Sequence, residues 1–472
     1  MGGKFWRRIK VFFLSSGQEV DMTDGPLFGK IVVFTIPLIL SGVLQLLYNA
    51  ADVIVVGRFA HDGQTAIAAV GSTGALTNLI VNLFVGLSVG TSVSVSHALG
   101  ARNEDEVHKL VHTSILTAIF GGVIVFGIGF VLAKPLLLMM DTPETVIEFS
   151  TLYMRIIFCG MPAQMLYNYG SAILRAKGDT GWPLIFLTVS GMANVLLNLL
   201  LVIGFGLDVA GVAIATIVSQ YLSATMVLVH LTRLNDSCKL VWRKLHFHLH
   251  SFGKLLRIGI PAGVQGMVFS ISNVLIQSSI NSFGQAAMAG NTAASSLDGF
   301  IYIAMNALHH TALTFTGQNY GAGKPDRVRR VAFQTTASVT VVGVVIGMAV
   351  FFFGRPLLAI YRPGDEEAIS YGMIRLTYLA TTYFTCGIMD VGSGLLRGIG
   401  KSTVSTVISL TGACLFRVVW IYTVFAEFRT LDVLYLSYPI SWVLTSAVDF
   451  ALFAFLWRKW KKRLAKTAGL PA

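Results

Sequence analysis

Long apolar stretches separated by short polar segments run through this sequence from residue 31 to residue 457. Each is close to or above the roughly 20 residues that an α-helix needs to cross the hydrocarbon core of a bilayer. Their approximate limits are 31–56, 67–97, 112–133, 148–174, 183–204, 210–232, 257–283, 287–317, 331–354, 370–396, 403–426 and 433–457. The pattern therefore predicts an all-α polytopic membrane protein with twelve transmembrane helices.

The second half of the sequence repeats the first after about 222 residues. Three motifs recur: Gly170-Ser-Ala-Ile-Leu-Arg-Ala-Lys-Gly178 as Gly392-Ser-Gly-Leu-Leu-Arg-Gly-Ile-Gly400, Ala98-Leu-Gly-Ala-Arg102 as Asn319-Tyr-Gly-Ala-Gly323, and Ile36-Pro37 as Ile260-Pro261. Each half holds six predicted spans, an even number, so both halves have the same orientation. We therefore predict two six-helix lobes related by a pseudo-two-fold axis along the membrane normal, with a cleft between them that supports alternating access.

The composition excludes a set of soluble domains. Hydrophobic residues make up 54% of the 472 residues and charged residues only 12%, about half of the ~25% charged residues in a typical soluble domain. The four cysteines are far apart and lack the CxxC spacing of a zinc site. We therefore expect a protein embedded in the lipid bilayer, with no cofactor and no structural metal.

The net charge of +12 is unevenly distributed along the chain. With twelve spans, 27 of the 35 Lys and Arg residues lie on the side of the membrane that holds both termini. The positive-inside rule places that side in the cytoplasm, as in a multi-pass protein of the cell (inner) membrane. Because topology accounts for the basic excess, we expect no nucleic-acid partner.

This topology predicts five regions along the chain. They are a cytoplasmic N-terminal segment (1–27), a first lobe (28–232), a basic cytoplasmic linker (233–255), a second lobe (256–458) and a basic cytoplasmic tail (459–472). Residues 4–14 fit either a basic amphipathic helix on the inner membrane surface or a polar leader. A two-lobed chain with its own cleft needs no partner subunit, so we expect a monomer.

Polar side chains inside the spans mark candidate sites, because a charge at bilayer depth costs at least ~2.5–3.5 kcal/mol on insertion scales. In the first span, Asp52 shares one helix face with Gln45 and Tyr48. The alternative is a water-facing helix end, since Arg58 follows six residues later. Against it, the apolar run 53–56 continues the helix for another turn. Asp52 is therefore the main candidate for a functional charge.

Spans 5 and 6 belong to the same predicted lobe as Asp52 and add neutral polar groups. Asn194 and Asn198 are one helical turn apart, and Thr216 begins a polar stripe on span 6. Such residues often serve only to hold helices together. Combined with Asp52, two carboxamides and a hydroxyl also suit a site for a small cation or a proton.

The second lobe places its acids at different positions. Asp390 on span 10 corresponds to Asn168 in the repeat, while span 7 has no acid and offers only Gln265 and Gln277. Asp298 on span 8 is either a functional acid or the partner of an intramembrane base. We regard as weaker candidates another acid and two bases that suit counter-ions or side chains reaching toward the membrane surface: Asp449, Arg155 and Arg417.

Taken together, these motifs resemble the MATE family of multidrug and toxic compound extrusion antiporters. The resemblance rests on Ile36-Pro37, Asn49-Ala-Ala-Asp52, Gly57-Arg58, Leu174-Arg175-Ala-Lys-Gly178 and Gly317-Gln-Asn-Tyr-Gly-Ala-Gly323. It covers about residues 25–460 and implies a secondary active antiporter that exports small organic cations by alternating access. The position of Asp52 on the first helix is similar to that of the aspartate in the DinF-like branch of the family.

The resemblance also implies site residues. In the DinF-like branch a tyrosine, polar or acidic residues on helix 5 and a threonine on helix 6 surround the aspartate, which corresponds here to Tyr48, Asn194, Asn198 and Thr216 around Asp52. An archaeal relative has aspartate at the position of Asn198. The NorM branch uses an acid on helix 10, which Asp390 matches, and a glutamate on helix 7, which this chain lacks. The resemblance therefore favours protons as the coupling ion, with sodium at the Asp52 cluster as the alternative.

Antiport follows if protonation and binding of a cationic drug compete for the single negative charge of Asp52. Two other classes of function remain open. A flippase for lipid-linked oligosaccharides has the same two-lobe architecture but needs basic residues to hold pyrophosphate. A membrane-embedded enzyme is the third class, although Gly400-Lys401-Ser402 lacks the first glycine and the preceding strand of a phosphate-binding loop.

Overall fold

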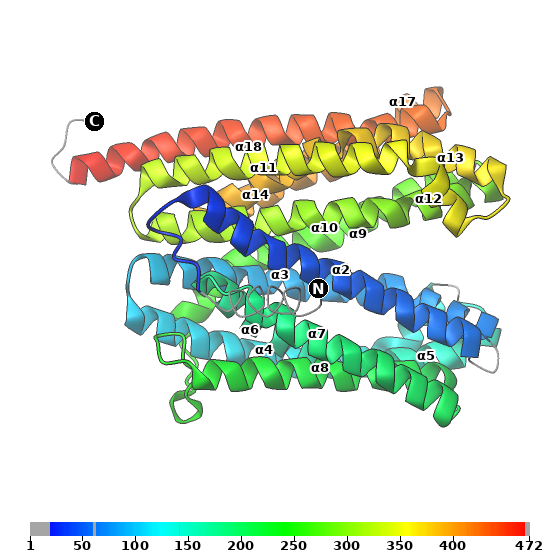
Figure 1. Ribbon diagram of the computed structural model, residues 1–472, viewed down its shortest axis with the longest axis horizontal. Helices are drawn as coiled ribbons and strands as arrows, with labels where there is room; N and C mark the ends of the chain where they lie inside the picture. Colours follow the sequence, from blue (N-terminus) through cyan, green and yellow to red (C-terminus); the bar gives the residue numbers. More distant parts are fainter. Residues whose placement is uncertain (1–18, 60–62, 141, 468–472) are drawn as a thin grey trace, which may run out of the picture. The chain divides into compact units, whose positions relative to one another are not determined.

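The structure, a computed structural model, describes residues 19–59, 63–140 and 142–467. Within these ranges the chain forms helices, turns and loops, and no residue is in a β-strand (Figure 1). The predicted all-α class is therefore confirmed. The segment 4–14, for which an amphipathic helix was one of two predictions, lies outside the described residues.

The chain divides into two compact units, which take up described residues 19–20 with 36–259 and 21–35 with 260–467. One of the three divisions lies between residues 20 and 21, and the other two fall inside α2 (Leu27–Phe59) and α9 (Leu249–Asn281), directly before Ile36-Pro37 and Ile260-Pro261. Proline inside a helix removes a backbone hydrogen-bond donor. At the two divisions inside helices, the chain therefore passes from one unit to the other next to a proline that donates no backbone hydrogen bond. The lobe and linker limits predicted from the sequence stay predictions.

In the first unit, α6 is the central helix and contacts α3, α4 and α8. Its Gly170, the first glycine of the repeated motif, lies so close to α8 that an added Cβ would be 2.1 Å from Val227 Cγ1. The remaining elements surround this helix: α3 (Gly63–Gly100), α4 (Glu104–Met139), α5 (Glu144–Cys159), α6 (Met161–Lys177), α7 (Gly181–Asn198), the π-helix η1 (Leu199–Gly204), α8 (Asp208–Arg233) and η2 (Trp242–Lys244).

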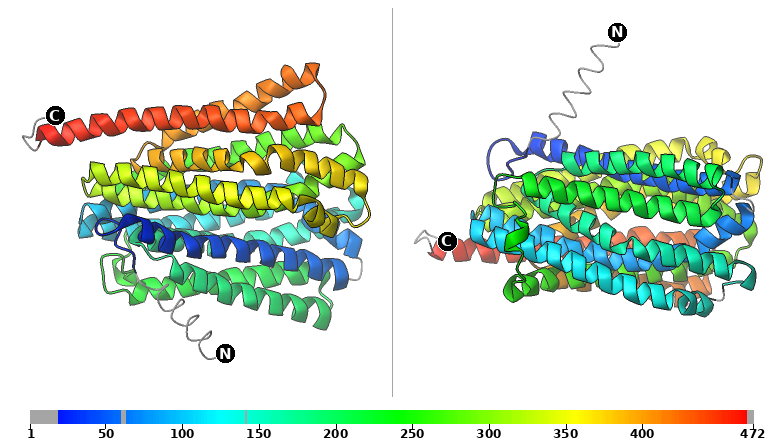
Figure 2. Two further views of the ribbon diagram at one scale, coloured as in Figure 1. Left: turned by 45° about the horizontal axis from the view of Figure 1, so that its top comes forward. Right: turned by 90° about the horizontal axis from the view of Figure 1, so that it is seen from below.

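In the second unit, α14 has the corresponding central place and contacts α10, α11 and α18. An added Cβ on Gly394 would lie 2.8 Å from the carbonyl oxygen of His309 on α10. The elements are α10 (Gln285–Gly321), α11 (Pro325–Phe352), α12 (Gly354–Tyr361), α13 (Glu366–Tyr378), η3 (Ala380–Thr382), α14 (Tyr383–Gly398), α15 (Ser402–Ser409), the π-helix η4 (Leu410–Leu415), α16 (Phe416–Tyr422), α17 (Val424–Glu427) and α18 (Leu431–Thr467). Figure 2 shows α18 as one long helix, which includes the described part of the basic tail.

Each of the twelve predicted spans lies on helix in the described part of the chain. Nine helices there are individually long and apolar enough to cross a membrane, and the bent pair α5–α6 makes a tenth. The other two predicted spans, 287–317 and 370–396, are α10, which is rich in polar residues, and the broken pair α13–α14. A multi-span membrane protein is confirmed, and the count of twelve crossings stays a prediction.

Several spans predicted as continuous are interrupted in the structure. The fourth bends by 44° between α5 and α6, at Gly160, and Pro162 in the first turn of α6 has no backbone donor. The tenth breaks at η3 between α13 and α14. Spans 5 and 11 pass through the π-helices η1 and η4. Hydrophobic length alone does not reveal such breaks, because they leave the apolar run intact.

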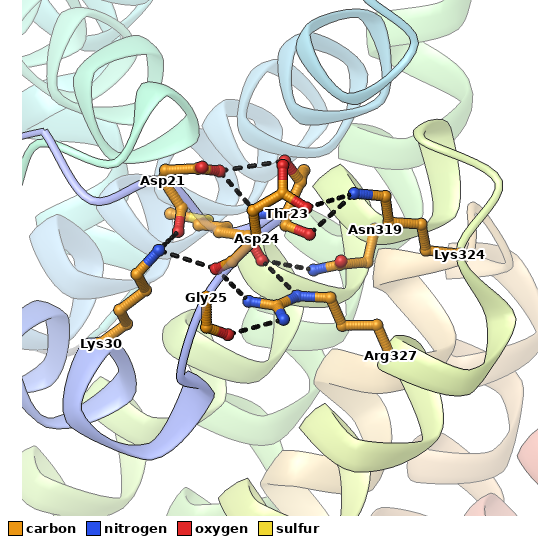
Figure 3. Close-up of polar contacts among 9 residues, drawn as sticks. Asp21, Thr23, Asp24, Gly25, Lys30, Asn319, Lys324 and Arg327 are labelled. Carbon is orange, nitrogen blue, oxygen red and sulfur yellow. Dashed lines mark hydrogen bonds and ion pairs between the residues drawn. The ribbon is translucent and has the colours of Figure 1, made fainter.

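The segment before α2 is fixed to the loop between α10 and α11, all within the second unit (Figure 3). Asn319 Nδ2 donates to the carbonyl of Met22 at 3.0 Å, and Lys324 Nζ contacts the carbonyl of Thr23 and the carboxylate of Asp24 at 2.9 and 2.8 Å. The hydrogen bond and the charge of Lys324 lower the pKa of Asp24. The repeated motif that begins at Asn319 therefore anchors the start of the first transmembrane helix.

Candidate functional site

Asp52 lies on α2 in the first unit, half-buried, and forms a polar cluster with α7. Asn198 Nδ2 donates to Asp52 Oδ1 at 2.5 Å and also contacts Asn194 Oδ1 at 3.3 Å. Asn198 is fully buried, and its own carboxamide oxygen has no partner among the described residues. The structure thus brings together three of the five residues predicted for this site, with two kinds of oxygen that can accept a proton or a cation.

Local helix geometry explains why Asn198 is at this position. The α-helix α7 ends at Asn198 and continues as the π-helix η1, whose Val202 packs with Val55 and Val56 of α2. A π-turn shifts the side-chain register within an otherwise regular helix and is frequent at functional sites. Apolar packing on the C-terminal side of Asp52 therefore holds the carboxylate against the carboxamides of α7.

Tyr48 lies one turn before Asp52 and packs against the same helix. Its hydroxyl donates to the carbonyl of Thr188 at 3.4 Å, and its ring lies where a Cβ on Gly191 would be, at 1.9 Å. Only glycine at position 191 leaves room for the tyrosine ring. Tyr48 therefore joins the α2–α7 contact next to the cluster.

The structure does not join every predicted residue to Asp52. Thr216 is half-buried and donates its hydroxyl to the carbonyl of Val212 in its own helix, at 2.9 Å. Gln45 is exposed on α2, and Asn168 is half-buried on α6. The roles predicted for these three residues stay predictions.

In the second unit, Asp298 is buried and forms an ion pair with Arg375 of α13. The distance from Arg375 Nε to Asp298 Oδ2 is 2.8 Å, and a second guanidinium nitrogen donates to Asn291 Oδ1 at 2.7 Å. Gln277, one of the two glutamines that span 7 offers in place of an acid, accepts from Asn291 Nδ2 at 2.9 Å. This geometry favours the structural alternative for Asp298, the pairing with an intramembrane base.

A second polar cluster in this unit surrounds Arg397. Its guanidinium donates to Gln265 Oε1 at 2.7 Å, while its Nε has no partner among the described residues. His309 Nδ1 donates to the backbone carbonyl of Asp390 at 2.6 Å. One carboxylate oxygen of Asp390 and both of the fully buried Asp449 are without a hydrogen-bond partner in the described chain. The half-buried Asp390, the buried Asp449 and the buried Arg397 thus lie in one helix bundle.

Two further intramembrane bases were not predicted. Besides Arg155 and Arg417, Arg375 and Arg397 lie inside the helix bundle and are buried, at 9% and 6% exposure. A signal was available for Arg375, which lies inside the predicted span 370–396 and is as unusual there as Asp390. Arg417 is buried, donates to Ser441 Oγ at 3.0 Å and covers the ring of Tyr438, and it forms no ion pair among the described residues, so its predicted role as a counter-ion stays a prediction.

Outside the spans, the turn after α6 contains a buried acid. Asp179 accepts the backbone N–H of Trp182 at 3.1 Å, as a side chain that caps the start of α7. Burial raises the pKa of Asp179 to about 6, even though this hydrogen bond lowers it. The neighbouring Lys177 forms ion pairs with Glu19 and Asp236. Asp179 therefore retains protons at a pH at which an exposed aspartate has lost them.

Comparison with known proteins identifies the family. The MatE family model matches residues 37–200 and again residues 261–423, so each half of the chain carries one copy, as the internal repeat predicted. These matches cover more than half of the chain. The protein belongs to the MATE family and is a membrane transporter, not an enzyme. The alternative of a membrane-embedded enzyme is therefore wrong, and the assignment to the DinF-like branch stays a prediction.

Individual relatives are similar over nearly their whole length. The chain is 28% identical over 437 residues to the probable multidrug resistance protein YoeA of Bacillus subtilis, covering 90% of this chain and 93% of that protein. It is 23% identical over 379 residues to the FAD transporter of Shewanella oneidensis, covering 79% and 82%. The outward-facing structure of a multidrug resistance MATE family transporter of the MOP superfamily matches with a TM-score of 0.87 at 20% identity, over 94% and 99% of the two chains. The last likeness supports the fold.

Proposed function

We propose that this protein is a secondary active antiporter that exports small organic cations from the cytoplasm in exchange for protons, with sodium as the alternative coupling ion. The first support is the kinship with a probable multidrug resistance protein over nine-tenths of the chain. The positive-inside distribution of Lys and Arg supports a place in the cytoplasmic membrane with both termini in the cytoplasm. The chemistry is assigned to the Asp52 cluster.

One observation carries the proposal: the carboxylate of Asp52 is held by a neutral amide and by no fixed cation. Among the described residues, no Lys, Arg or His side chain forms an ion pair with it. A carboxylate removed from bulk water without a fixed counter-charge requires a proton or another cation. Because its single charge binds one or the other, proton and drug compete there. Such competition couples the two fluxes in an antiporter.

Accumulation of ethidium in cells tests this proposal. It is measured in cells that express the wild type, Asp52→Asn or Asp326→Asn, and in cells without the protein. Asp326→Asn removes the same charge from the protein surface, where Asp326 pairs with Lys461. We expect low accumulation with the wild type and the surface control, and the accumulation of empty cells with Asp52→Asn. A protonophore in sodium-free buffer should raise wild-type accumulation to the same level. Equal accumulation with and without the protein contradicts drug export.

A second candidate function, transport of an organic anion, is favoured by the buried arginines of the second unit. Nε of Arg397 and one terminal nitrogen of Arg417 have no hydrogen-bond acceptor among the described residues. The guanidinium group of arginine binds phosphate and carboxylate groups through two parallel hydrogen bonds. In addition, one relative is named an FAD transporter. The flippase alternative also requires recognition of an anion, the pyrophosphate.

Purified protein in proteoliposomes distinguishes the two candidates. If organic cations are the substrates, labelled ethidium exchanges across the vesicle membrane, and a flavin dinucleotide does not compete. If anions are the substrates, the flavin dinucleotide is itself transported, and the neutralising variant Arg397→Gln abolishes its transport. Arg355→Gln serves as the matched control, because Arg355 is exposed and 3.8 Å from Glu366.

A further inference from the structure

The first unit contains an apolar cavity that the proposed transport chemistry does not use. Its volume is about 460 Å³, within the ~300–1,000 Å³ of small-ligand sites. The side chains around it come from α3, α4, α6, the segment before α9 and the start of α9, and they include Thr117, Phe120, Ile124, Phe247 and Phe252. We call it the α4 cavity.

The α4 cavity opens onto an apolar surface of the unit. Phe120 and Ile124 line it and are both 59% exposed, and Val123 between them is 54% exposed. In a membrane protein such a surface faces lipid chains. The hydroxyl of Thr117 is already used, because it donates to the carbonyl of Thr113 at 2.7 Å. The cavity therefore suits a hydrocarbon chain that enters from the bilayer.

One end of the cavity belongs to the basic segment that joins α8 to α9. Phe247 packs on Phe252 with ring centroids 4.8 Å apart, and both line the cavity. Arg243 and Lys244 precede Phe247 by four and three residues, so at most ~14 Å of extended chain separates them from it. Both are exposed, and neither forms an ion pair within the described chain.

The same segment has the composition of a membrane-surface anchor. Trp242 and Leu249 are 53% and 78% exposed and flank the two basic residues. Exposed tryptophan next to arginine and lysine is typical of the level of the lipid headgroups. Basic residues at that level attract anionic headgroups from the cytoplasmic leaflet. A cationic drug, in contrast, is repelled there, and a water-soluble anion gains nothing from an apolar cavity.

We propose that the α4 cavity binds one acyl chain of an anionic glycerophospholipid of the inner leaflet, whose phosphate headgroup Arg243 and Lys244 hold. The site lies within the first unit and is independent of the Asp52 cluster. An anionic lipid bound there connects the basic segment to α4 and stabilises the start of α9.

Native mass spectrometry of the full-length protein in detergent tests the proposal. Delipidated protein receives an equal mixture of phosphatidylglycerol and phosphatidylcholine with identical acyl chains. We expect the wild type to retain one phosphatidylglycerol in preference to phosphatidylcholine. Thr117→Phe, which fills the cavity, and Arg243→Gln/Lys244→Gln, which removes the headgroup charges, should each lower that binding by about tenfold or more. The matched controls Thr117→Val and Arg458→Gln/Lys459→Gln should bind as the wild type does.

Each other outcome overturns the proposal. Equal retention of the two lipids removes the headgroup selectivity, and unchanged binding by Thr117→Phe places the lipid outside the cavity. Unchanged binding by the charge variant rejects the role of Arg243 and Lys244, whose exposure makes misfolding a poor explanation for any loss. Displacement of the lipid by ethidium assigns the cavity to a drug instead.

Discussion

The two units hold Asp52 and Asp298 in opposite ways. In the first unit, the half-buried Asp52 accepts a hydrogen bond from Asn198 Nδ2 at 2.5 Å and forms no ion pair within the described residues. In the second unit, Asp298 is tied to Arg375 at 2.8 Å, and Asp390 and Asp449 share their helix bundle with Arg397. Asp52 is thus without a fixed counter-charge in the described chain, whereas Asp298 receives one from Arg375. Asp390 and Asp449 lie in the same bundle as Arg397 but form no ion pair with it among the described residues.

This difference indicates how one fold separates transport chemistry from stability. A paired acid does not exchange its partner without leaving a buried charge behind, and that loss is costly. An acid held by amides exchanges a proton for another cation with much smaller structural consequence. A repeated sequence can therefore hold a working charge in one half and a structural ion pair in the other.

The largest expected effect is that of Asp52→Asn, which removes the uncompensated charge. We expect complete loss of coupled efflux, because no negative charge is left for which proton and drug compete. Folding should be intact, since asparagine still accepts the hydrogen bond of Asn198. Transport assays together with a thermal melt of the purified variant check both parts. Efflux at the wild-type rate removes Asp52 from the mechanism.

Substitution of Arg375, in contrast to that of Asp52, is expected to lower the stability of the protein. Arg375→Met leaves the carboxylate of Asp298 buried and unpaired, which costs about 3–5 kcal/mol. The double variant Asp298→Asn/Arg375→Met should recover most of this loss, because no charge is left without a partner. Arg355→Met at the exposed pair with Glu366 should cost less than about 1 kcal/mol. Thermal or denaturant unfolding in detergent measures all three, and equal losses at Arg375 and Arg355 contradict the comparison.

Asp390→Asn tests whether an acid of the second unit takes part in coupling. Because Arg397 is at hand to balance this acid, its loss should impair transport of some organic cations but not abolish coupling. We expect rates reduced for part of a substrate panel, with the stoichiometry of exchange unchanged. Loss of transport for every substrate would mean that Asp390, like Asp52, is essential for coupling and is not balanced by Arg397. Wild-type rates for every substrate reject any role of Asp390.

The smallest expected effect concerns the turns that follow α6 and α14. In the sequence repeat, Asp179 of the first turn corresponds to the exposed Lys401 of the second. Burial raises the pKa of Asp179 to about 6, while an unfolded aspartate titrates near ~3.9. The folded state therefore binds more protons between these values, and stability falls as the pH rises from about 4 to about 6. Asp179→Asn keeps the acceptor for Trp182 and should stabilise the protein by about 1–3 kcal/mol at pH 7.5.

The control for this prediction is the same substitution at an exposed acid. Asp326→Asn should leave the pH dependence of the melting temperature as in the wild type, whereas Asp179→Asn should flatten it between pH 4 and 6. A variant that melts lower than the wild type at pH 7.5 contradicts the effect of burial on Asp179.

Much of this organisation was readable from the sequence. Hydrophobic length predicted the helices, and the recurring motifs predicted the two copies that the family model matches. Helical spacing placed Asn194 and Asn198 on one face, and the predicted lobe and the family resemblance grouped them with Asp52. The helix breaks at Gly160 and η3 were not predicted, because an apolar run does not show where its backbone hydrogen bonds change.

The partners of the second unit's acids were harder to predict. Arg375 and Asp298 lie 77 positions apart in the sequence, so no local spacing connects them. The role of Gln277 in orienting Asn291, which in turn holds Arg375, depends on packing among three helices. Residue type alone marks these positions as unusual in a membrane span but does not say which charges are balanced.

The most direct test of the central claim measures protons released when drug binds to the purified protein. Detergent-solubilised wild type in weakly buffered, sodium-free solution receives ethidium, and a pH indicator records the release. The account predicts about half a proton released per bound ethidium at the pH at which Asp52 of the drug-free protein is half protonated, and none from Asp52→Asn. Equal proton release by the wild type and Asp52→Asn contradicts it.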